Sequence, residues 1–283
     1  MKTVFLIPIL LGGLFLSSLH AAPVMLKVGS YNLRLNTSRD LPVNRWKARA
    51  PRCLEVLKAE KFDIFGTQET QKCHIETITS IGYKAIGLPR DNSKAPEHST
   101  IFYNPETLEL QKTETFWLSE TPDVPGSRSW NTACPRICTV GYFTHKASGK
   151  IFLFVNTHLD HKSQPARKNG IKLIMTYLRK FKLDYPYILT GDFNARPDSD
   201  VYKEIAGFMA DARTIAETIL PSPKQTFHAY QADPAKRRMS LPIDYIFVNN
   251  IAVKVKSFQV IDDFKNGLAS SDHFPVTATI VLK

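Results

Sequence analysis

Residues 187–195 read YILTGDFNA, an apolar run that ends abruptly at Gly191, Asp192 and Asn194. Apolar runs of this length, bounded by glycine and polar residues, are typical of buried strands, so we predict a strand over residues 187–191. Asp192 and Asn194 then lie just past the carboxyl end of the strand. Loops on a rigid scaffold commonly carry functional residues at such positions. A polar residue at the end of a single strand is more often a turn or cap residue. A functional role is indicated only if several strands end in such residues.

Five other apolar runs begin or end in the same way. Their polar residues are Asn32 in SYNLR, Glu69 in TQET, His158 in NTHLDH, Asp244 in IDYIFV, and Asp272 with His273 in SDHFPV. Because strand ends of layered sheets converge on one edge, we expect these side chains to meet. Carboxylate and amide oxygens without thiolates suit Mg²⁺ or Mn²⁺. Histidines beside carboxylates suit acid–base work, so the set predicts phosphate-ester hydrolysis.

The composition of the chain is compatible with such an enzyme. Its 283 residues are 43% hydrophobic and 22% charged, which allows a sizeable core and excludes global disorder. Lys and Arg outnumber Asp and Glu by 37 to 26, giving a net charge of +11. This surplus limits the expected partners to anions such as phosphates, nucleic acid or an anionic surface. The alternative is that the positive charge forms a basic, solvated surface that binds no partner.

Hydrophobic periodicity predicts an alternating α/β chain. Predicted strands cover residues 26–32, 62–68, 99–103, 137–144, 151–158, 187–191, 244–249, 253–260 and 276–282. Predicted helices cover residues 51–61, 74–81, 165–181 and 198–209, with Pro51 in the first turn of its helix and Asp198 or Ser199 as an N-cap. Several strands follow one another in hairpin-like runs, which favours two mixed sheets over one doubly wound sheet. No linker divides the chain, so we expect one domain over residues 23–283.

Residues 1–22, MKTVFLIPILLGGLFLSSLHAA, predict a secretory signal peptide. The apolar run after Lys2 is shorter than a membrane span, although a retained N-terminal anchor is the alternative. Export to the periplasm or the medium would permit disulfides. Structural thiols or disulfides are favoured over a zinc site because no Cys-x-x-Cys is present. The pairing is left open for Cys53, Cys73, Cys134 and Cys138.

Taken in order, the segments SYN, QE, NTH, GDFN, DYIF and SDH resemble the endonuclease/exonuclease/phosphatase superfamily, which has the DNase I-like fold. The likeness runs from Asn32 to His273 and is specific as a set. It implies a four-layer α/β sandwich, in which two packed mixed β-sheets are flanked by helices. The stretch FWLSETPDVPGSRSW (116–130) and the later CPR (134–136) further resemble an exported bacterial subgroup of this superfamily.

The resemblance also implies a role for each matching residue. The implied metal ligands are Glu69, Asn32 and Asp272. The implied catalytic residues are Asp192 for the attacking water, Asn194 beside it, His273 for the scissile phosphate, Asp244 to orient His273, and His158 for the phosphate or leaving group. The candidate substrate contacts are Arg34, Arg136 and Arg167, because arginine suits bidentate phosphate binding. Arg34 stands where the abasic-site repair branch carries an acid, which argues against that repair role.

Together these features predict an exported phosphoesterase that depends on a divalent metal and hydrolyses a phosphodiester by in-line attack of water. A phosphomonoesterase acting on sugar, inositol or lipid headgroups is an alternative, and so is an extracellular nuclease. A non-catalytic binding protein is disfavoured, because the residue set is intact. We expect a phosphate-ester substrate as the partner, whether nucleic acid, phospholipid or small metabolite. We expect a monomer with no obligate protein partner.

Overall fold

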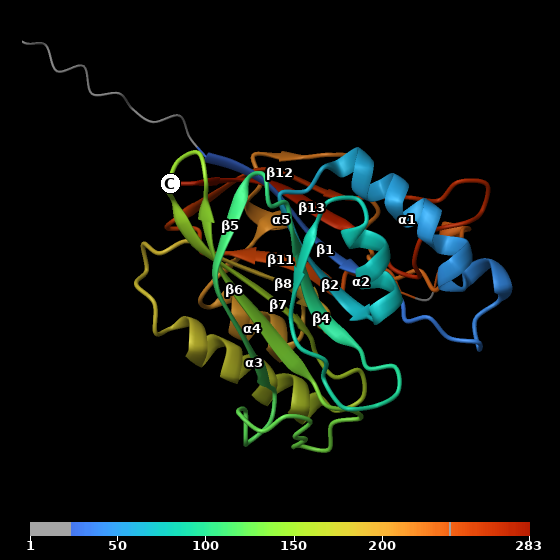
Figure 1. Ribbon diagram of the computed structural model, residues 1–283, viewed down its shortest axis with the longest axis horizontal. Helices are drawn as coiled ribbons and strands as arrows, with labels where there is room; N and C mark the ends of the chain where they lie inside the picture. The colour runs from blue at the N-terminus through green and yellow to red at the C-terminus, as the bar shows by residue number, and fades with distance from the viewer. Residues whose placement is uncertain (1–23, 238) are drawn as a thin grey trace, which may run out of the picture.

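The computed structural model describes residues 24–237 and 239–283, and its core is a pair of stacked β-sheets (Figure 1). The first sheet contains β1 (Val24–Asn32), β2 (Ile64–Thr70), β3 (Lys84–Ile86), β4 (His98–Tyr103), β10 (Thr218–Ile219), β12 (Val253–Val260) and β13 (Val276–Leu282). The second contains β5 (Leu108–Trp117), β6 (Ile137–His145), β7 (Ile151–His158), β8 (Tyr187–Asp192), β9 (Ala210–Asp211) and β11 (Asp244–Val248). The predicted signal peptide lies outside the described residues.

The helices of the protein are α1 (Trp46–Glu60), α2 (Lys72–Thr79), α3 (Gln164–Leu178), α4 (Asp200–Ala206) and α5 (Ala212–Ile215). Short 3-10 turns lie at Pro42–Asn44 and Pro234–Lys236. Among the described residues, no helix has the length and apolar character needed to cross a membrane.

Both sheets are mixed, as predicted. The strand orders are β10-β12-β13-β1-β2-β4-β3 and β5-β6-β7-β8-β11-β9. In the first sheet β1 pairs in parallel with β2 and antiparallel with β13. In the second sheet β7 pairs in parallel with β8 and antiparallel with β6. Parallel pairs place their carboxyl ends at the same sheet edge. The predicted site residues Asn32, His158 and Asp192 lie at the carboxyl ends of β1, β7 and β8.

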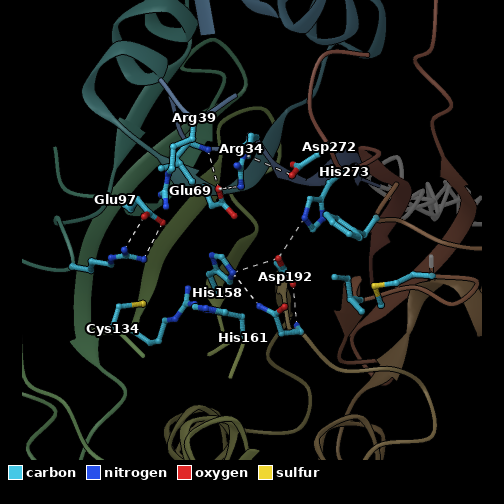
Figure 2. A pocket seen from close by; sticks show the side chains of 17 residues that line it. Arg34, Arg39, Glu69, Glu97, Cys134, His158, His161, Asp192, Asp272 and His273 are labelled. Atoms are coloured by element: carbon cyan, nitrogen blue, oxygen red, sulfur yellow. Dashed lines mark hydrogen bonds and ion pairs between the residues drawn. The ribbon is translucent and has the colours of Figure 1, made fainter. Parts of the chain in front are cut away.

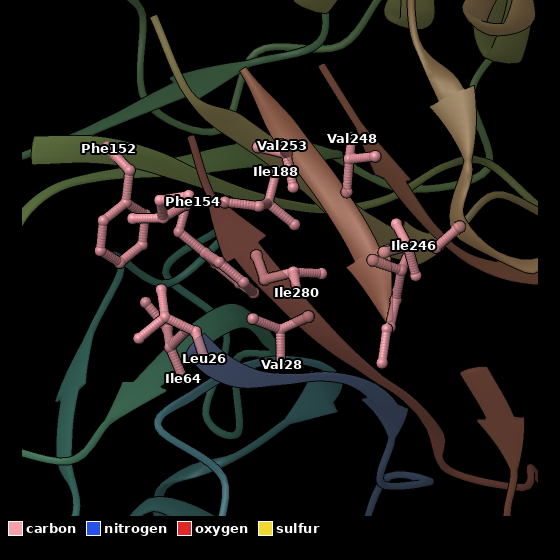
Figure 3. Packing of buried hydrophobic residues seen from close by; sticks show 14 of the residues in the cluster. Leu26, Val28, Ile64, Phe152, Phe154, Ile188, Ile246, Val248, Val253 and Ile280 are labelled. Carbon is pink, nitrogen blue, oxygen red and sulfur yellow. The ribbon is translucent and has the colours of Figure 1, made fainter. Parts of the chain in front are cut away.

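Three clusters of apolar side chains hold four layers together: one lies between the two sheets, and one lies between each sheet and the helices on its outer face. The central cluster between the sheets includes Val28, Ile64, Phe154, Ile188 and Ile280 (Figure 3). A second cluster packs α1 and α2 on the outer face of the first sheet, and a third packs α3 and α4 on the outer face of the second. The four-layer α/β sandwich is therefore confirmed.

The main departure from the predicted elements is α1, which begins at Trp46 instead of Pro51. Pro51 lies inside the helix, so its assignment to the first turn was wrong. Tertiary contacts extend the helix: the indole Nε1 of Trp46 lies 3.3 Å from both the Cys73 carbonyl oxygen and Thr77 Oγ1. Tertiary contacts of this kind commonly override local helix signals. Prediction also missed β3 and β5, which are the terminal strands of their sheets.

All four cysteines are free thiols, and Cys53 and Cys138 are buried in the core. Of the two options that the sequence favoured, the structure thus has structural thiols and not disulfides.

Arg49 is fully buried in α1 and ties three segments together. Its guanidinium donates to the carbonyl oxygens of Asn44 (2.6 Å), Leu33, Ser270 and Arg34 (2.7 Å each). Leu33 and Arg34 follow β1, and Ser270 belongs to the loop before β13. One side chain therefore fixes two of the loops that carry predicted site residues.

We expect Arg49→Met to lower the free energy of unfolding by about 3 kcal/mol or more, because each buried acceptor left unpaired costs ~1–3 kcal/mol. Urea denaturation followed by circular dichroism measures this change. Lys47→Met, on the exposed face of the same helix, is the matched control and should leave the midpoint unchanged. An equal midpoint for both variants would show that the Arg49 bonds do not hold these loops.

Candidate active site

The register of the second sheet places three predicted site residues side by side. His158 at the end of β7 pairs with Asp192 at the end of β8, and Asp244 at the start of β11 pairs with Asp192 from the other side. His273 precedes β13 and forms an antiparallel bridge with Phe227. The predicted convergence of strand ends is therefore confirmed for this sheet.

Glu69 reaches the same edge through an irregularity in β2. The register of β2 against β4 shifts between Thr67 and Thr70, and Glu69 takes a φ of 55°. Such a bulge re-aims a side chain out of the strand's normal alternation. Arg34 (φ 54°) and Asn194 (φ 46°) also adopt the left-handed region, which is uncommon outside glycine. Backbone of this kind often marks a functional site.

These residues surround a cleft with a volume of about 440 Å³ (Figure 2). The predicted residues that line it are Arg34, Glu69, Arg136, His158, Asp192, Asn194, Asp272 and His273. Asn32 and Asp244 are buried directly behind this lining. Arg167 lies outside the cleft: it donates to the Asp160 carbonyl oxygen (2.7 Å) and lines a separate hollow beside α3 and α4. Its prediction as a substrate contact is not supported, because it lies on α3 and not at a strand end.

His273 is held and charged by Asp244. Its Nδ1 lies 2.9 Å from Asp244 Oδ2, an oxygen that also accepts from Thr226 Oγ1 at 2.5 Å. Burial alone would lower the pKa of His273, but the charge and hydrogen bond of Asp244 and the charge of Asp192 raise it to about 10. The ring is therefore an imidazolium at neutral pH. Its Nε2 lies 3.9 Å from Asp192 Oδ2.

Asp192 is the central carboxylate of the site. It accepts hydrogen bonds from Asn32 Nδ2 (3.0 Å) and from the Asn194 backbone N–H (2.9 Å). Burial and the nearby charge of Asp244 raise the pKa of Asp192, while His273 opposes this change. A carboxylate with a raised pKa is a better proton acceptor, because its pKa lies closer to neutrality.

His158 is neutral, in contrast to His273. Burial, together with the charges of Arg136 and Arg90, lowers the pKa of His158 well below its ordinary value. Its Nε2 lies 3.1 Å from Asn194 Nδ2 and 3.4 Å from Asp192 Oδ2. The two histidines that flank Asp192 thus have opposite protonation states, and their neighbours set the difference.

Glu69 and Asp272 offer carboxylate oxygens on either side of the Arg34 guanidinium. Glu69 Oε2 accepts from the Leu35 N–H (2.9 Å), and the Arg34 guanidinium lies between Glu69 (4.0 Å) and Asp272 (3.8 Å). Two carboxylates without sulfur ligands match the donor preference of Mg²⁺ or Mn²⁺. Asn32 has a different place: its Oδ1 accepts from the Arg34 N–H, and its Nδ2 lies 3.3 Å from Glu69 Oε1. These bonds hold Asn32 beside Glu69, and its predicted role as a metal ligand stays a prediction.

A tighter group is formed by Asp192, Asp244 and His273, each of which offers one atom within 4.8 Å of the others. We interpret this group as a hydrogen-bonded cluster and not as a cation site. His273 Nδ1 already forms a hydrogen bond with Asp244 Oδ2 at 2.9 Å, so this nitrogen has no free lone pair for a metal. The cation-compatible oxygens remain those of Glu69 and Asp272.

Sequence reasoning missed the segment that supports His273. Thr226 is fully buried, and its hydroxyl accepts from the backbone N–H groups of Ile243 (3.0 Å) and Asp244 (3.1 Å) while it donates to Asp244. The ring of Phe227 packs against that of His273 with centroids 4.8 Å apart. A threonine in an irregular segment carries no sequence signal, so only the fold shows this role.

Asp160 orders the loops beside His158. It accepts from Thr132 Oγ1 and the Ala133 N–H (3.0 Å each), from the Lys162 N–H (3.0 Å) and from the Ser163 N–H (2.7 Å). Burial opposes ionisation of this carboxyl. The backbone donors and Arg136 nevertheless lower its pKa from 3.8 to about 2.

Because the folded pKa is lowered, ionised Asp160 stabilises the protein above about pH 4. We expect this contribution to disappear as pH falls from 4 towards 2. The free energy of unfolding of Asp160→Asn should therefore fall below wild type at pH 7, and the gap should narrow as pH approaches 2. Urea titrations across this range test it, with the exposed Asp123→Asn as control. A gap that does not change with pH would contradict the assignment.

The fold and the site together define a class of protein. A four-layer α/β sandwich carries carboxylates, asparagines, one neutral histidine and one positively charged histidine at one sheet edge, which is the arrangement expected of a phosphate-ester hydrolase. Residues 29–273 match the model of the Endonuclease/Exonuclease/phosphatase family. The chain belongs to this family, whose members are phosphoesterase hydrolases.

Solved structures of similar proteins agree with this assignment. An endonuclease/exonuclease/phosphatase from Bacteroides vulgatus is 33% identical with a TM-score of 0.85, covering 92% of this chain and all of that one. The mannosyl-6-phosphatase Bt3783 of Bacteroides thetaiotaomicron is 34% identical with a TM-score of 0.83, covering 91% of this chain and 100% of that one. Nocturnin of Drosophila melanogaster is 23% identical over 250 residues, which span 75% of this chain and 37% of that protein. The match spans between 37% and 60% of the length of the curated relatives.

Proposed function

We propose that this protein hydrolyses a phosphate ester by in-line attack of water, with a divalent cation held by Glu69 and Asp272. The observation that carries the proposal is the line of groups across the cleft: neutral His158, Asp192 with a raised pKa, and charged His273 held by Asp244. This arrangement offers a proton acceptor beside a fixed positive charge.

Each residue then has a distinct task. Asp192 takes a proton from the attacking water, and Asn194 orders the loop that holds it. The His273 imidazolium donates to the phosphate oxygen on which negative charge develops, which a preorganised donor stabilises strongly. The P–O bond to the leaving group breaks as the bond to water forms, and the leaving oxygen takes a proton from solvent while Asp192 returns its proton to solvent. A monoester thus gives phosphate and an alcohol. A bound divalent cation neutralises phosphate charge and lowers the pKa of water.

The nature of the ester is a further proposal. The sequence interpretation placed a phosphodiester first, and a sugar-phosphate monoester is the second candidate. The 34% identity to a mannosyl-6-phosphatase over 91% of this chain supports the monoester. We also propose export, on the signal-like composition of residues 1–22.

Turnover of two chromogenic esters tests the proposal. The purified protein with Mg²⁺ is assayed on p-nitrophenyl phosphate and on bis(p-nitrophenyl) phosphate, with EDTA as control. Turnover of either ester that EDTA abolishes supports the proposed hydrolase, and the preferred ester decides between the two candidates. Absence of turnover of both, together with absence of phosphate release from mannose 6-phosphate, would contradict it.

A further inference from the structure

One wall of the cleft has no task in the proposed reaction. This polar wall consists of Arg90, Glu97, Arg136 and His161, all of which line the cleft. Figure 2 shows Glu97 and His161 on the side of the cleft opposite His273. Arg90 and Glu97 lie between β3 and β4, Arg136 immediately precedes β6, and His161 follows β7. Four polar side chains from three separate loops thus face one space.

Arg90 and Glu97 form a fixed pair at the edge of this wall. Arg90 Nη1 and Nη2 lie 2.9 and 2.7 Å from the two carboxylate oxygens of Glu97, and the Arg90 N–H donates to the Glu97 carbonyl oxygen at 2.9 Å. Only 14% of the Glu97 side chain is exposed. Each carboxylate oxygen has a second lone pair, so Glu97 can still accept hydrogen bonds from a ligand.

Arg136 is the deepest group of the wall. Its side chain is 5% exposed, and it is held through Nε by Asp160 Oδ2 (3.5 Å) and through Nη2 by His161 Nδ1 (3.0 Å). Within the described part of the chain, Nη1 donates to no protein acceptor. A small hollow is lined by Arg90, Glu97 and Arg136 of this wall and by Glu69 and His158 of the site of hydrolysis.

The other wall of the cleft is apolar. It is formed by Phe227, Met239 and Ile243. Among the described lining residues, Phe227 is the one Phe, Tyr or Trp, and it packs on His273 in a T-shaped arrangement with an interplanar angle of 62°. Stacking of a nucleobase on this wall would depend on Phe227 alone, and part of that ring is already in contact with His273. An acyl chain would cover the Arg90–Glu97 ion pair and Nη1 of Arg136 without supplying a hydrogen bond to either, which is costly.

We propose that the polar wall binds neighbouring hydroxyl groups of the leaving group, so that the substrate is the phosphate ester of a sugar or polyol. This inference rests on the proposed hydrolysis at the same site. Glu97 accepts hydrogen bonds from the hydroxyls, and Arg136 donates to their oxygens. The apolar wall covers the carbon face of the ring. Glu97 and Arg136 therefore determine specificity, while the cluster around Asp192 performs the reaction.

The test compares two esters that differ only in the presence of hydroxyls and ring oxygen. The full protein with Mg²⁺ is assayed for phosphate release from mannose 6-phosphate and from cyclohexylmethyl phosphate. We expect wild type to favour the sugar ester in kcat/KM by about 100-fold or more, because two or more hydrogen bonds to charged groups are lost with the second ester. Glu97→Gln and Arg136→Lys should each reduce this ratio by about 10-fold or more. The exposed Glu109→Gln is the control and should keep the wild-type ratio.

The outcomes separate the two proposals. Equal kcat/KM for both esters in wild type, or an unchanged ratio in Glu97→Gln, would overturn the hydroxyl-binding wall while leaving the hydrolase intact. Turnover confined to bis(p-nitrophenyl) phosphate would also overturn it. Absence of turnover of every ester, p-nitrophenyl phosphate included, would overturn both proposals. Glu97→Gln keeps the volume of the side chain, so it tests the inference even if Arg136→Lys fails to fold.

Discussion

His273→Ala is expected to lower kcat by about 10²–10³-fold, the usual cost of removing one preorganised donor to a developing negative charge. The residue is buried, its Nδ1 is bonded to Asp244, and its pKa is raised to about 10, so it supplies a fixed positive charge near Asp192. Alanine removes the charge and leaves Thr226 as the remaining hydrogen-bond partner of Asp244. KM should change less than kcat, because the charge that His273 stabilises develops only in the transition state.

The matched control is His145→Ala. His145 lies at the end of β6 and bonds to Ser148 Oγ (2.9 Å), away from the cleft residues. Its kcat should equal that of wild type. Steady-state kinetics with p-nitrophenyl phosphate, together with circular dichroism to verify folding, measures both variants. A folded His273→Ala protein with wild-type kcat would remove His273 from the reaction.

Glu69→Gln is expected to give the second large loss, of about 10²–10³-fold in activity at limiting Mg²⁺. The substitution keeps the shape of the side chain but removes the charge opposite Asp272. Activity should recover partly at high Mg²⁺, because the glutamine oxygen can still bind the cation, although more weakly than the carboxylate of Glu69. A Mg²⁺ titration of turnover measures the shift.

Direct binding of Mn²⁺, followed by its paramagnetic signal, gives a readout that does not depend on turnover. Glu69→Gln should bind Mn²⁺ more weakly than wild type. Glu76→Gln on α2, whose side chain is 64% exposed, should bind it as wild type does. The same Mn²⁺ affinity and Mg²⁺ response in Glu69→Gln and wild type would move the cation site away from Glu69.

The fold was largely predictable because most strands are buried on both faces. Strands β12 and β13 have the predicted bounds, since β12 alternates apolar and polar residues and β13 is a continuous run of apolar and β-branched residues. The start of α1 was not predictable, because Trp46 and Arg49 are fixed by partners far away in the sequence. Terminal strands such as β5 are partly exposed and polar, so periodicity does not distinguish them from loops.

The site residues that lie at the ends of strands were predictable from the sequence. The residues positioned by a bulge or by an irregular loop were not. The register of β7, β8 and β11 aligns His158, Asp192 and Asp244, as strand ends in the sequence had indicated. The bulge that turns Glu69 into the cleft has no sequence signature. Thr226 lies far along the chain from His273, and only packing shows that it holds Asp244.

Transfer of oxygen from labelled water tests the central claim most directly. The protein with Mg²⁺ hydrolyses its preferred ester in H₂¹⁸O, and phosphorus-31 NMR of the released phosphate locates the label. Attack of water on phosphorus predicts one ¹⁸O in each phosphate and none in the alcohol. Label in the alcohol, with unlabelled phosphate, would mean that the C–O bond breaks and would contradict the roles given to Asp192 and His273.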